Sequence, residues 1–540
     1  MSTKRQSFME GALILIVAGF LVKVIGAVFK IPLYNIIGAQ ANAYFTVAYD
    51  IYTWMYILTT SGLPVAISRM VSESNAVGRY GNSRRILSVA FSAFFVLGIA
   101  GSAVLWFGAD TLAALMNNEN AAMAIRIIAP AIMFEIVMSS YRGYFQGYQN
   151  MVPTAVSQII VALAKLGGGI AVAKYILSLG LPEKELLPLL AAGAISGVTL
   201  GTVLGSLYLV VRRRMAAPAL PGGIVASDAL ESRKHILRRL VAITVPIAIG
   251  SSVMSVTNLV DTSVVLDRLL AAGFSQTDAE IMFGAYSGMA RTLFNLPTAL
   301  IIPIGIAVIP AIAQRFSVGD RAASSGILGS ALRLAILMAL PAGLGLSFMS
   351  KPILDLLYPA RPEDAVMVAP LLSMLGIAVM FVCLVSITNA ILQAIGREQV
   401  PVFTILVGGC VKVVTNFTLV GRPDVNIYGA PVGTNLCYFI IMALNLLYIR
   451  KTLGHLPHVM GFTAKALGAS LVACAGARLL YDYAAVGMGG RLATVLGIAF
   501  AGVVYVGIVL ITKAMRREDV ILLPKGEKIA QILEKRNWMV

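Results

Sequence analysis

A series of apolar segments, each long enough to cross a lipid bilayer, constrains this chain more than any other feature. Residues 11–22, 86–107, 186–211 and 492–511 are examples. About twenty apolar residues in a helix span a hydrocarbon layer of roughly 30 Å. Because no water satisfies backbone groups in that layer, helices are the expected spanning structure. The chain is therefore predicted to be an all-α integral membrane protein.

Hydropathy predicts about fourteen transmembrane helices. Basic residues cluster in alternate connections, with roughly two dozen on one side and half a dozen on the other. The positive-inside rule then places both termini in the cytoplasm of a multi-pass plasma-membrane protein. The predicted spans are residues 10–33, 43–69, 84–107, 121–145, 152–177, 186–211, 236–263, 283–313, 326–350, 366–395, 400–420, 428–450, 463–484 and 490–513.

Composition excludes several other classes of protein. Only 12% of residues are charged and 58% are hydrophobic, whereas soluble domains carry about 25% charged residues. The net charge of +17 does not indicate nucleic-acid binding, because the basic residues lie between apolar segments rather than in one basic domain. The four cysteines lie inside apolar segments without a Cys-x-x-Cys pair, so neither a disulfide framework nor a metal site is expected.

Two halves of the chain carry matching signals. Gln146 precedes Lys165 by nineteen residues, and Gln393 precedes Lys412 by the same nineteen. A second, weaker echo pairs residues 61–73 with 304–316. Many transporters are built from such repeats, with a binding site between them. The predicted organisation is an N-lobe of six spans (1–215), a cytoplasmic linker (216–235), a pseudo-symmetric C-lobe of six spans (236–455), two extra C-terminal helices (456–513) and a cytoplasmic amphipathic tail (514–540).

Four stretches carry a resemblance to a known family: GALILIVAGFLVKVIGAVFKIPLYNIIGAQ, SGLPVAISRMVSE, YFQGYQNMVPTAVSQI and EDVILLPKGEKI. They resemble the polysaccharide-transporter branch of the MOP exporter superfamily, and most of all its SpoVB/YtgP group, which is related to the MurJ flippases. The resemblance implies fourteen helices in two lobes, a flippase for lipid-linked cell-wall precursors such as lipid II, and a lipid-tail groove at the last two spans. The sequence departs from MurJ in its charges: Lys23 and Lys30 stand in the first helix where MurJ has arginines, and residues 52–60 contain no basic residue.

Basic residues inside the predicted spans indicate an anionic cargo. Each charged residue at mid-membrane costs about 2.5 to 3.5 kcal/mol against lipid, so these side chains are expected to face a hydrated or paired interior. Lysine and arginine neutralise phosphate oxygens. For Lys30 the alternative is snorkelling to the interface. For Arg142, as for Arg69 and Arg333, snorkelling to the cytoplasmic side is the favoured alternative. The candidate substrate-binding residues are Lys23, Lys30, Arg142, Lys165, Arg291 and Lys412.

Acidic residues in the spans are fewer. Asp50, Glu135 and Asp261 are candidates for salt bridges or for coupling transport to an ion, with structural pairing as the default. An acid-rich pocket would favour a cation-coupled multidrug exporter of the sister branch, and the excess of basic residues disfavours it. A non-transporting scaffold for cell-wall or spore assembly is a further alternative, although it would not require buried charges in both repeats.

Enzymatic activity is not predicted. The sequence contains no phosphate-binding G-x-x-x-x-G-K-[ST] loop, H-E-x-x-H pair or G-x-S-x-G elbow, and its three histidines lie in or beside loops. We expect no cofactor or metal, with the membrane potential or a coupling ion as the driving force. The predicted activity is movement of a lipid-linked oligosaccharide diphosphate between leaflets of the bacterial plasma membrane by alternating access. The predicted partners are this anionic lipid and the bilayer, with no nucleic acid and a functional monomer.

Overall fold

The computed structural model describes residues 8–215, 230–454, 457, 459–521, 527, 531, 534 and 535. His455, His458, the central part of the linker and most of the predicted amphipathic tail lie outside these residues. Nearly all of the described chain is helical and none of it forms a strand, which confirms the all-α prediction. Contacts divide the chain into two units, Met1–Asp267 with Gln276–Gly284 and Arg268–Ser275 with Ala285–Val540. The domain limits drawn from the sequence stay predictions.

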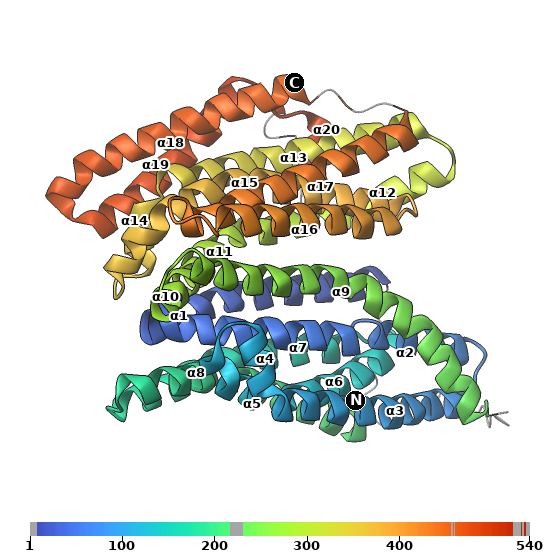
Figure 1. The fold of residues 1–540 in the computed structure, drawn as a ribbon. Coiled ribbons are helices and arrows are strands. Elements are labelled where there is room, and N and C mark those ends of the chain that lie inside the picture. The colour runs from blue at the N-terminus through green and yellow to red at the C-terminus, as the bar shows by residue number, and fades with distance from the viewer. Residues whose placement is uncertain are drawn as a thin grey trace. The chain divides into compact units, whose positions relative to one another are not determined.

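The first unit, here called the N unit, begins with a helix of 53 residues, α1. Gly38 interrupts this helix with φ 75°, a left-handed conformation that glycine adopts without steric cost. The break separates the two spans that hydropathy predicts there. The other helices of this unit follow in chain order (Figure 1). The bounds are α1 Phe8–Thr60, α2 Leu63–Ala76, α3 Tyr80–Phe107, α4 Ala109–Leu115, η1 Glu119–Ala121, α5 Ala122–Ile128, α6 Pro130–Gly147, α7 Val152–Ser178, α8 Glu183–Met215, α9 Arg233–Ala271 and α10 Gln276–Ala285.

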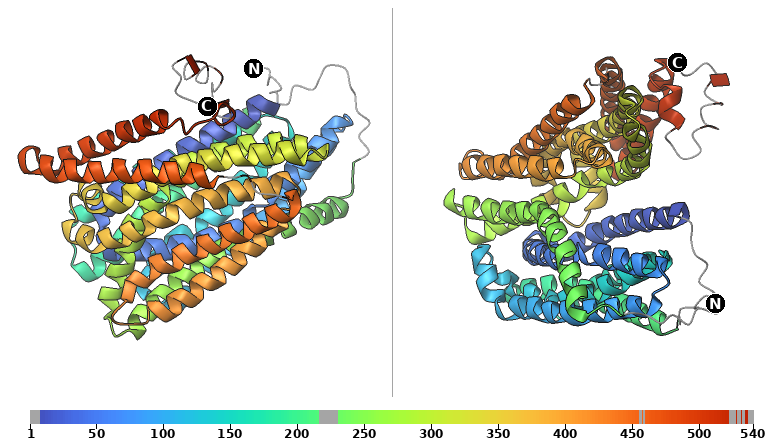
Figure 2. Two further views of the ribbon diagram at one scale, coloured as in Figure 1. Left: turned by 90° about the horizontal axis from the view of Figure 1, so that it is seen from above. Right: turned by 90° about the vertical axis from the view of Figure 1, so that its right-hand side faces the viewer.

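The second unit, the C unit, includes a π-helical turn, η2, and near its end a helical hairpin that a short helix, α20, follows (Figure 1). The hairpin is made by α18 and α19, and α18 packs against α13. Figure 2 shows the same helices from two further directions. The bounds are η2 Tyr286–Ala290, α11 Arg291–Phe294, α12 Leu296–Ser317, α13 Arg321–Phe348, α14 Ser350–Leu357, α15 Pro362–Ala394, α16 Gln399–Leu419, η3 Asn426–Tyr428, α17 Gly429–Leu453, α18 Met460–Met488, α19 Gly490–Ile511 and α20 Arg517–Ile521.

Twelve helical segments of the described chain are long and apolar enough to cross a membrane. The first of them, Leu13–Ala76, has 64 residues, about three times the length that one crossing needs. The membrane fold is confirmed, whereas the predicted total of fourteen spans is not. Long helices also bend: Pro246 lies inside α9, and Figure 1 shows this helix curving along its length.

A short helix follows one of the long helices in each unit, a feature that hydropathy did not predict. In the N unit, α4 follows α3, and in the C unit α14 follows α13. A long helix pair then closes each six-helix set: α7 packs along α8, and α16 packs along α17. The two halves therefore share the same order of long and short helices.

Candidate functional site

Lys165 is the most distinctive charged residue inside the N unit. It is half-buried on α7, where its Nζ lies 4.2 Å from the ring centroid of Tyr49 and 5.1 Å from that of Phe29. Both rings belong to α1, on opposite sides of the Gly38 break. Aromatic faces attract a cation and do not neutralise it. The ammonium is thus held in place with its charge available.

Tyr49 is part of a row of aromatic side chains along α1. Successive ring centroids lie 5.8 Å apart from Phe45 to Tyr49, 6.0 Å from Tyr49 to Tyr52, and 6.0 Å from Tyr52 to Tyr56. The residues are spaced by four, three and four positions, which places them on one helix face. This row is not among the residues predicted from the sequence, although its helical spacing is visible there.

Glu135 and Arg142 form a buried pair on α6. Their side chains are 8% and 11% exposed, and Arg142 Nη1 lies 3.9 Å from Glu135 Oε2. The guanidinium also donates through Nε to Ser157 Oγ on α7 at 2.9 Å. Arg142 is therefore turned toward α7 and held there by these contacts. The two charges compensate each other within the N unit.

The other candidates of the N unit lie on α1 and α9. Asp50 Oδ2 accepts a hydrogen bond from the Thr262 hydroxyl at 2.8 Å, and Asp261, the residue before Thr262, is buried. This contact ties α9 to the second part of α1. On the first part of α1, Lys23 is exposed and Lys30 is half-buried.

In the C unit, Lys412 is buried on α16, and Asn416 follows one turn later with no exposed surface. Gly433 of α17 faces this turn so closely that a Cβ there would lie 2.3 Å from Asn416 Oδ1. In the N unit, a glycine of α8 packs in a similar way against the turn of α7 that carries Lys165. A Cβ on Gly197 of α8 would lie 2.7 Å from the Lys165 carbonyl oxygen. In both lobes, a glycine of the following helix packs against the turn that carries the lysine.

The lysines themselves keep the register found in the sequence. Lys165 and Lys412 differ by 412 − 165 = 247 positions, and Gln146 and Gln393 differ by 393 − 146 = 247. The first pair lies on α7 and α16, and the second on α6 and near the end of α15. The lysines and glutamines therefore repeat in one register, whereas the glycines that pack against the lysine-bearing turns, Gly197 and Gly433, differ by 433 − 197 = 236 positions.

The same offset of 247 positions relates a charged residue of the N unit to a neutral residue of the C unit. Arg142 and Ser157 correspond to Asn389 and Thr404, each pair again differing by 247 positions. In the C unit, Asn445 donates to Asn389 Oδ1 at 2.8 Å and accepts from the Thr404 hydroxyl at 2.8 Å. The contact that is charged in the N unit is thus a neutral hydrogen-bonded cluster in the C unit.

Arg291 comes directly after the π-helical turn η2 and is half-buried. Such turns are rare and often mark functional positions. The hydroxyl of Tyr358 donates to the Gly288 carbonyl inside this turn at 3.3 Å. Tyr358 is fully buried, and burial raises the pKa of its phenol, so the hydroxyl stays protonated and able to donate.

Arg333 was predicted to snorkel to the cytoplasmic side, and this prediction is wrong. The residue is buried on α13, and its Nη2 lies 2.6 Å from Asp519 Oδ1 while its Nε donates to both carboxylate oxygens. Asp519 belongs to the EDVILLPKGEKI stretch, so this part of the sequence anchors the segment after α19 to the C unit. Hydropathy could not find this pairing, because the partners are 186 residues apart.

The sequence-predicted residues thus fall into two sets. In the N unit, Lys165 meets the α1 rings, Arg142 meets Glu135, and Asp50 meets Thr262. Arg291 and Lys412 belong to the C unit. Their role in binding a substrate stays a prediction. Among the described residues, no three or more His, Cys, Asp or Glu side chains gather as a metal site.

Known proteins are similar to this chain along most of its length. Lipid II flippase MurJ of Bacillus subtilis is 25% identical, covering 83% of each chain. Stage V sporulation protein B of the same organism is 23% identical over 96% of this chain and 98% of its own. These two relatives are a flippase and a sporulation protein, and the resemblance to the SpoVB and MurJ group is confirmed.

Solved structures show the same fold. The inward closed conformation of lipid II flippase MurJ aligns with a TM-score of 0.67 at 15% identity, over 92% of this chain and 98% of that one. An inward-facing MATE transporter of the MOP superfamily aligns with a TM-score of 0.62 at 13% identity, over 81% and 98%. The sequence profile of the family described as polysaccharide biosynthesis protein matches residues 8–316, more than half of the 540 residues. The chain belongs to the polysaccharide biosynthesis protein family.

Proposed function

We propose that this protein is a flippase that moves a lipid-linked oligosaccharide diphosphate, such as lipid II, from the inner to the outer leaflet of the bacterial plasma membrane. The observation that carries the proposal is the pair of lysines in matching positions of the two lobes, Lys165 and Lys412. A lysine binds phosphate as a point charge without demanding one geometry, which suits a diphosphate that changes position during transport. The similarity to lipid II flippase MurJ supports this substrate class.

The charge balance of the N unit favours an anion over a cation. Glu135 is compensated by Arg142, and Asp50 is hydrogen-bonded by Thr262. Lys165 is held by aromatic rings, which leave its positive charge in place. A cation-coupled multidrug exporter, the alternative within transport, would need uncompensated acidic groups instead.

The proposed mechanism is alternating access by the two lobes, without a nucleotide. With the inside of the cell negative, outward movement of an anion gains about 2.3 kcal/mol per charge per 100 mV. A diphosphate with two charges would gain roughly twice that. The membrane potential is therefore sufficient in principle to drive export, and a coupling ion is the other candidate. The proposal includes a monomer with both termini in the cytoplasm and no enzymatic step.

The test is complementation in a bacterial strain that depends on this protein for growth and lacks other flippases for the same precursor. Lipid II exposed on the cell surface is measured after depletion and after restoring the wild type. We expect depletion to abolish surface exposure while precursor synthesis continues. Normal exposure with raised drug sensitivity would support the exporter instead. Normal exposure with misplaced wall enzymes would support the scaffold.

A further inference from the structure

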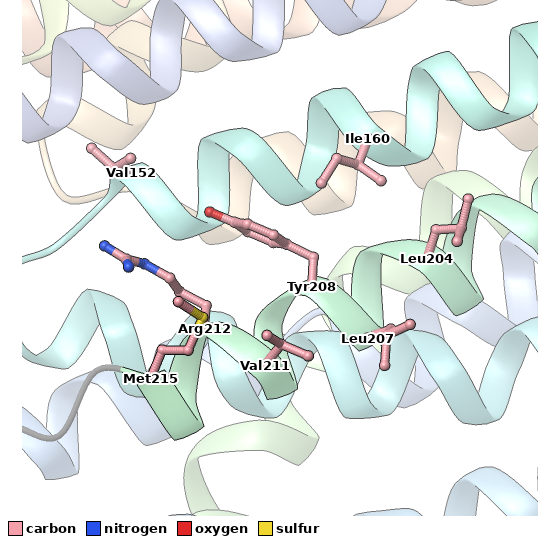
Figure 3. A pocket seen from close by; sticks show the side chains of 8 residues that line it. All are labelled: Val152, Ile160, Leu204, Leu207, Tyr208, Val211, Arg212 and Met215. Atoms are coloured by element: carbon pink, nitrogen blue, oxygen red, sulfur yellow. The ribbon is translucent and has the colours of Figure 1, made fainter.

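A groove with a volume of about 610 Å³ lies between α7 and α8 (Figure 3). Before the groove on α8, the backbones of the two helices are in close contact: a Cβ on Gly197 would lie 2.5 Å from the Gly169 nitrogen, and a Cβ on Gly201 would lie 2.8 Å from the Val161 carbonyl oxygen. Small residues permit such close approach between membrane helices. The groove lies further toward the end of α8, where Leu204 and the larger residues that follow Gly205 line it.

The lining of this groove is mostly apolar, and the only two polar side chains among the described residues that line it lie toward one end, beside Val152, Val211 and Met215 (Figure 3). Ile160 of α7 and Leu204 and Leu207 of α8 supply the apolar end (Figure 3). Tyr208 and Arg212 supply the polar end, and their spacing of four residues places them on one face of α8. In Figure 3, the Tyr208 hydroxyl and the Arg212 guanidinium both point away from the leucines. The groove therefore has the polarity of a lipid, with an apolar channel and a cationic end.

The three arginines at the end of α8, residues 212–214, differ in what they contact. Arg213 places its guanidinium 5.0 Å from the Tyr144 ring centroid, so it is engaged inside the N unit. Arg214 is exposed and does not line the groove, whereas Arg212 does. The positive-inside rule places these three arginines at the cytoplasmic surface. The inner leaflet there contains anionic lipids, which attract basic residues near the membrane.

We propose that the groove between α7 and α8 binds one anionic phospholipid of the inner leaflet. An acyl chain lies along Ile160, Leu204 and Leu207, and the headgroup phosphate contacts the Arg212 guanidinium and the Tyr208 hydroxyl. Arginine suits this role because its planar donors match phosphate oxygens. The site is separate from the proposed transport site, since the Lys165 ammonium faces rings of α1. The bound phospholipid is a structural ligand of the N unit and is not the cargo.

The full-length protein is purified in a mild detergent, and native mass spectrometry measures how much phosphatidylglycerol it retains relative to phosphatidylcholine with the same acyl chains. The wild type is expected to prefer phosphatidylglycerol several-fold, and Arg212→Gln to lose most of that preference. Arg214→Gln removes the same charge two residues away and is expected to behave as the wild type. Leu204→Trp keeps every charge and fills the channel, so it is expected to lower retention of both lipids at this site.

Three results would overturn the proposal. Equal losses in Arg212→Gln and Arg214→Gln would mean that surface charge attracts the lipid without a built site. Equal retention of the two phospholipids by the wild type would mean that the phosphate is not recognised. Displacement of phosphatidylglycerol by undecaprenyl phosphate at equal concentration would assign the groove to a polyprenyl chain. None of these results depends on flippase activity, so the groove and the proposed function can fail separately.

Discussion

Asp519→Asn tests the buried ion pair that holds the segment after α19. The side chains of Arg333 and Asp519 are only 7% and 3% exposed, and the carboxylate accepts from both Nε and Nη2 of the arginine. Breaking a buried pair on one side leaves an uncompensated charge and costs about 3–5 kcal/mol. For a unit of this size, 1 kcal/mol corresponds to about 2–4 °C in melting temperature, so Asp519→Asn is expected to lower it by roughly 6 °C or more.

The C unit offers a matched control for this substitution. Arg478 and Asp482 form an exposed pair one helical turn apart, with Nε and Oδ2 separated by 3.1 Å. An exposed pair of this kind contributes about 0.3–0.5 kcal/mol. Asp482→Asn should therefore change the melting temperature by about 2 °C or less. The measurement is thermal unfolding of the detergent-solubilised protein, followed by size-exclusion chromatography with fluorescence detection.

A double-mutant cycle compares the double variant Arg333→Met with Asp519→Leu against each of these two substitutions alone. Replacing both charges with apolar groups of similar volume removes the desolvation cost together with the attraction, so this variant should melt close to the wild type. A stabilising buried pair is contradicted if Asp519→Asn is no less stable than Asp482→Asn. It is also contradicted if the double variant is as unstable as the sum of its two single substitutions, Arg333→Met and Asp519→Leu.

Three further predictions concern the N unit. Gly197→Ala should destabilise the protein by about 1–3 kcal/mol through overpacking. Gly167→Ala, on the open side of α7, should not destabilise it. Equal melting temperatures of the two variants would contradict the close packing at Gly197. Tyr49→Phe should keep flipping activity and Tyr49→Leu should lower it several-fold, because only Tyr49→Leu removes the ring beside Lys165. Equal activities of the two variants would show that the ring is dispensable. Glu135→Gln should lower stability by about 3 kcal/mol because the buried Arg142 loses its counter-charge, and unchanged thermal unfolding would contradict a compensating pair.

Much of the helical framework could be predicted from hydropathy, because each span must be apolar over its own length. The two spans predicted in the first 69 residues correspond to the parts of α1 on either side of Gly38, with α2 continuing the second. The repeat in the sequence also corresponds to the packing of Lys165 and Lys412 against a glycine of the next helix. Hydropathy could not predict the number of spans in the same way, because one helical segment of 64 residues and several short helices do not divide into equal crossings.

The partners of the charged residues could not be predicted in the same way. Whether Arg142 reaches solvent or Ser157 depends on how α6 is rotated against α7, and hydropathy does not specify that rotation. Arg333 shows the same limit, since its partner lies beyond five further long helices. The aromatic row of α1 was visible in the spacing of its residues, but only the position of Lys165 gives Tyr49 a role.

The most direct test of the proposed cationic site is flipping of fluorescent lipid II by purified protein in liposomes with an inside-negative potential, measured by accessibility to a membrane-impermeant quencher. Lys165→Ala and Lys412→Ala are compared with Lys174→Ala, which removes the same charge from an exposed position of α7. We expect Lys165→Ala and Lys412→Ala to lose at least tenfold in rate, Lys174→Ala to match the wild type, and Lys165→Arg to keep most activity. Wild-type rates in both Lys165→Ala and Lys412→Ala, at equal reconstitution, would contradict the account.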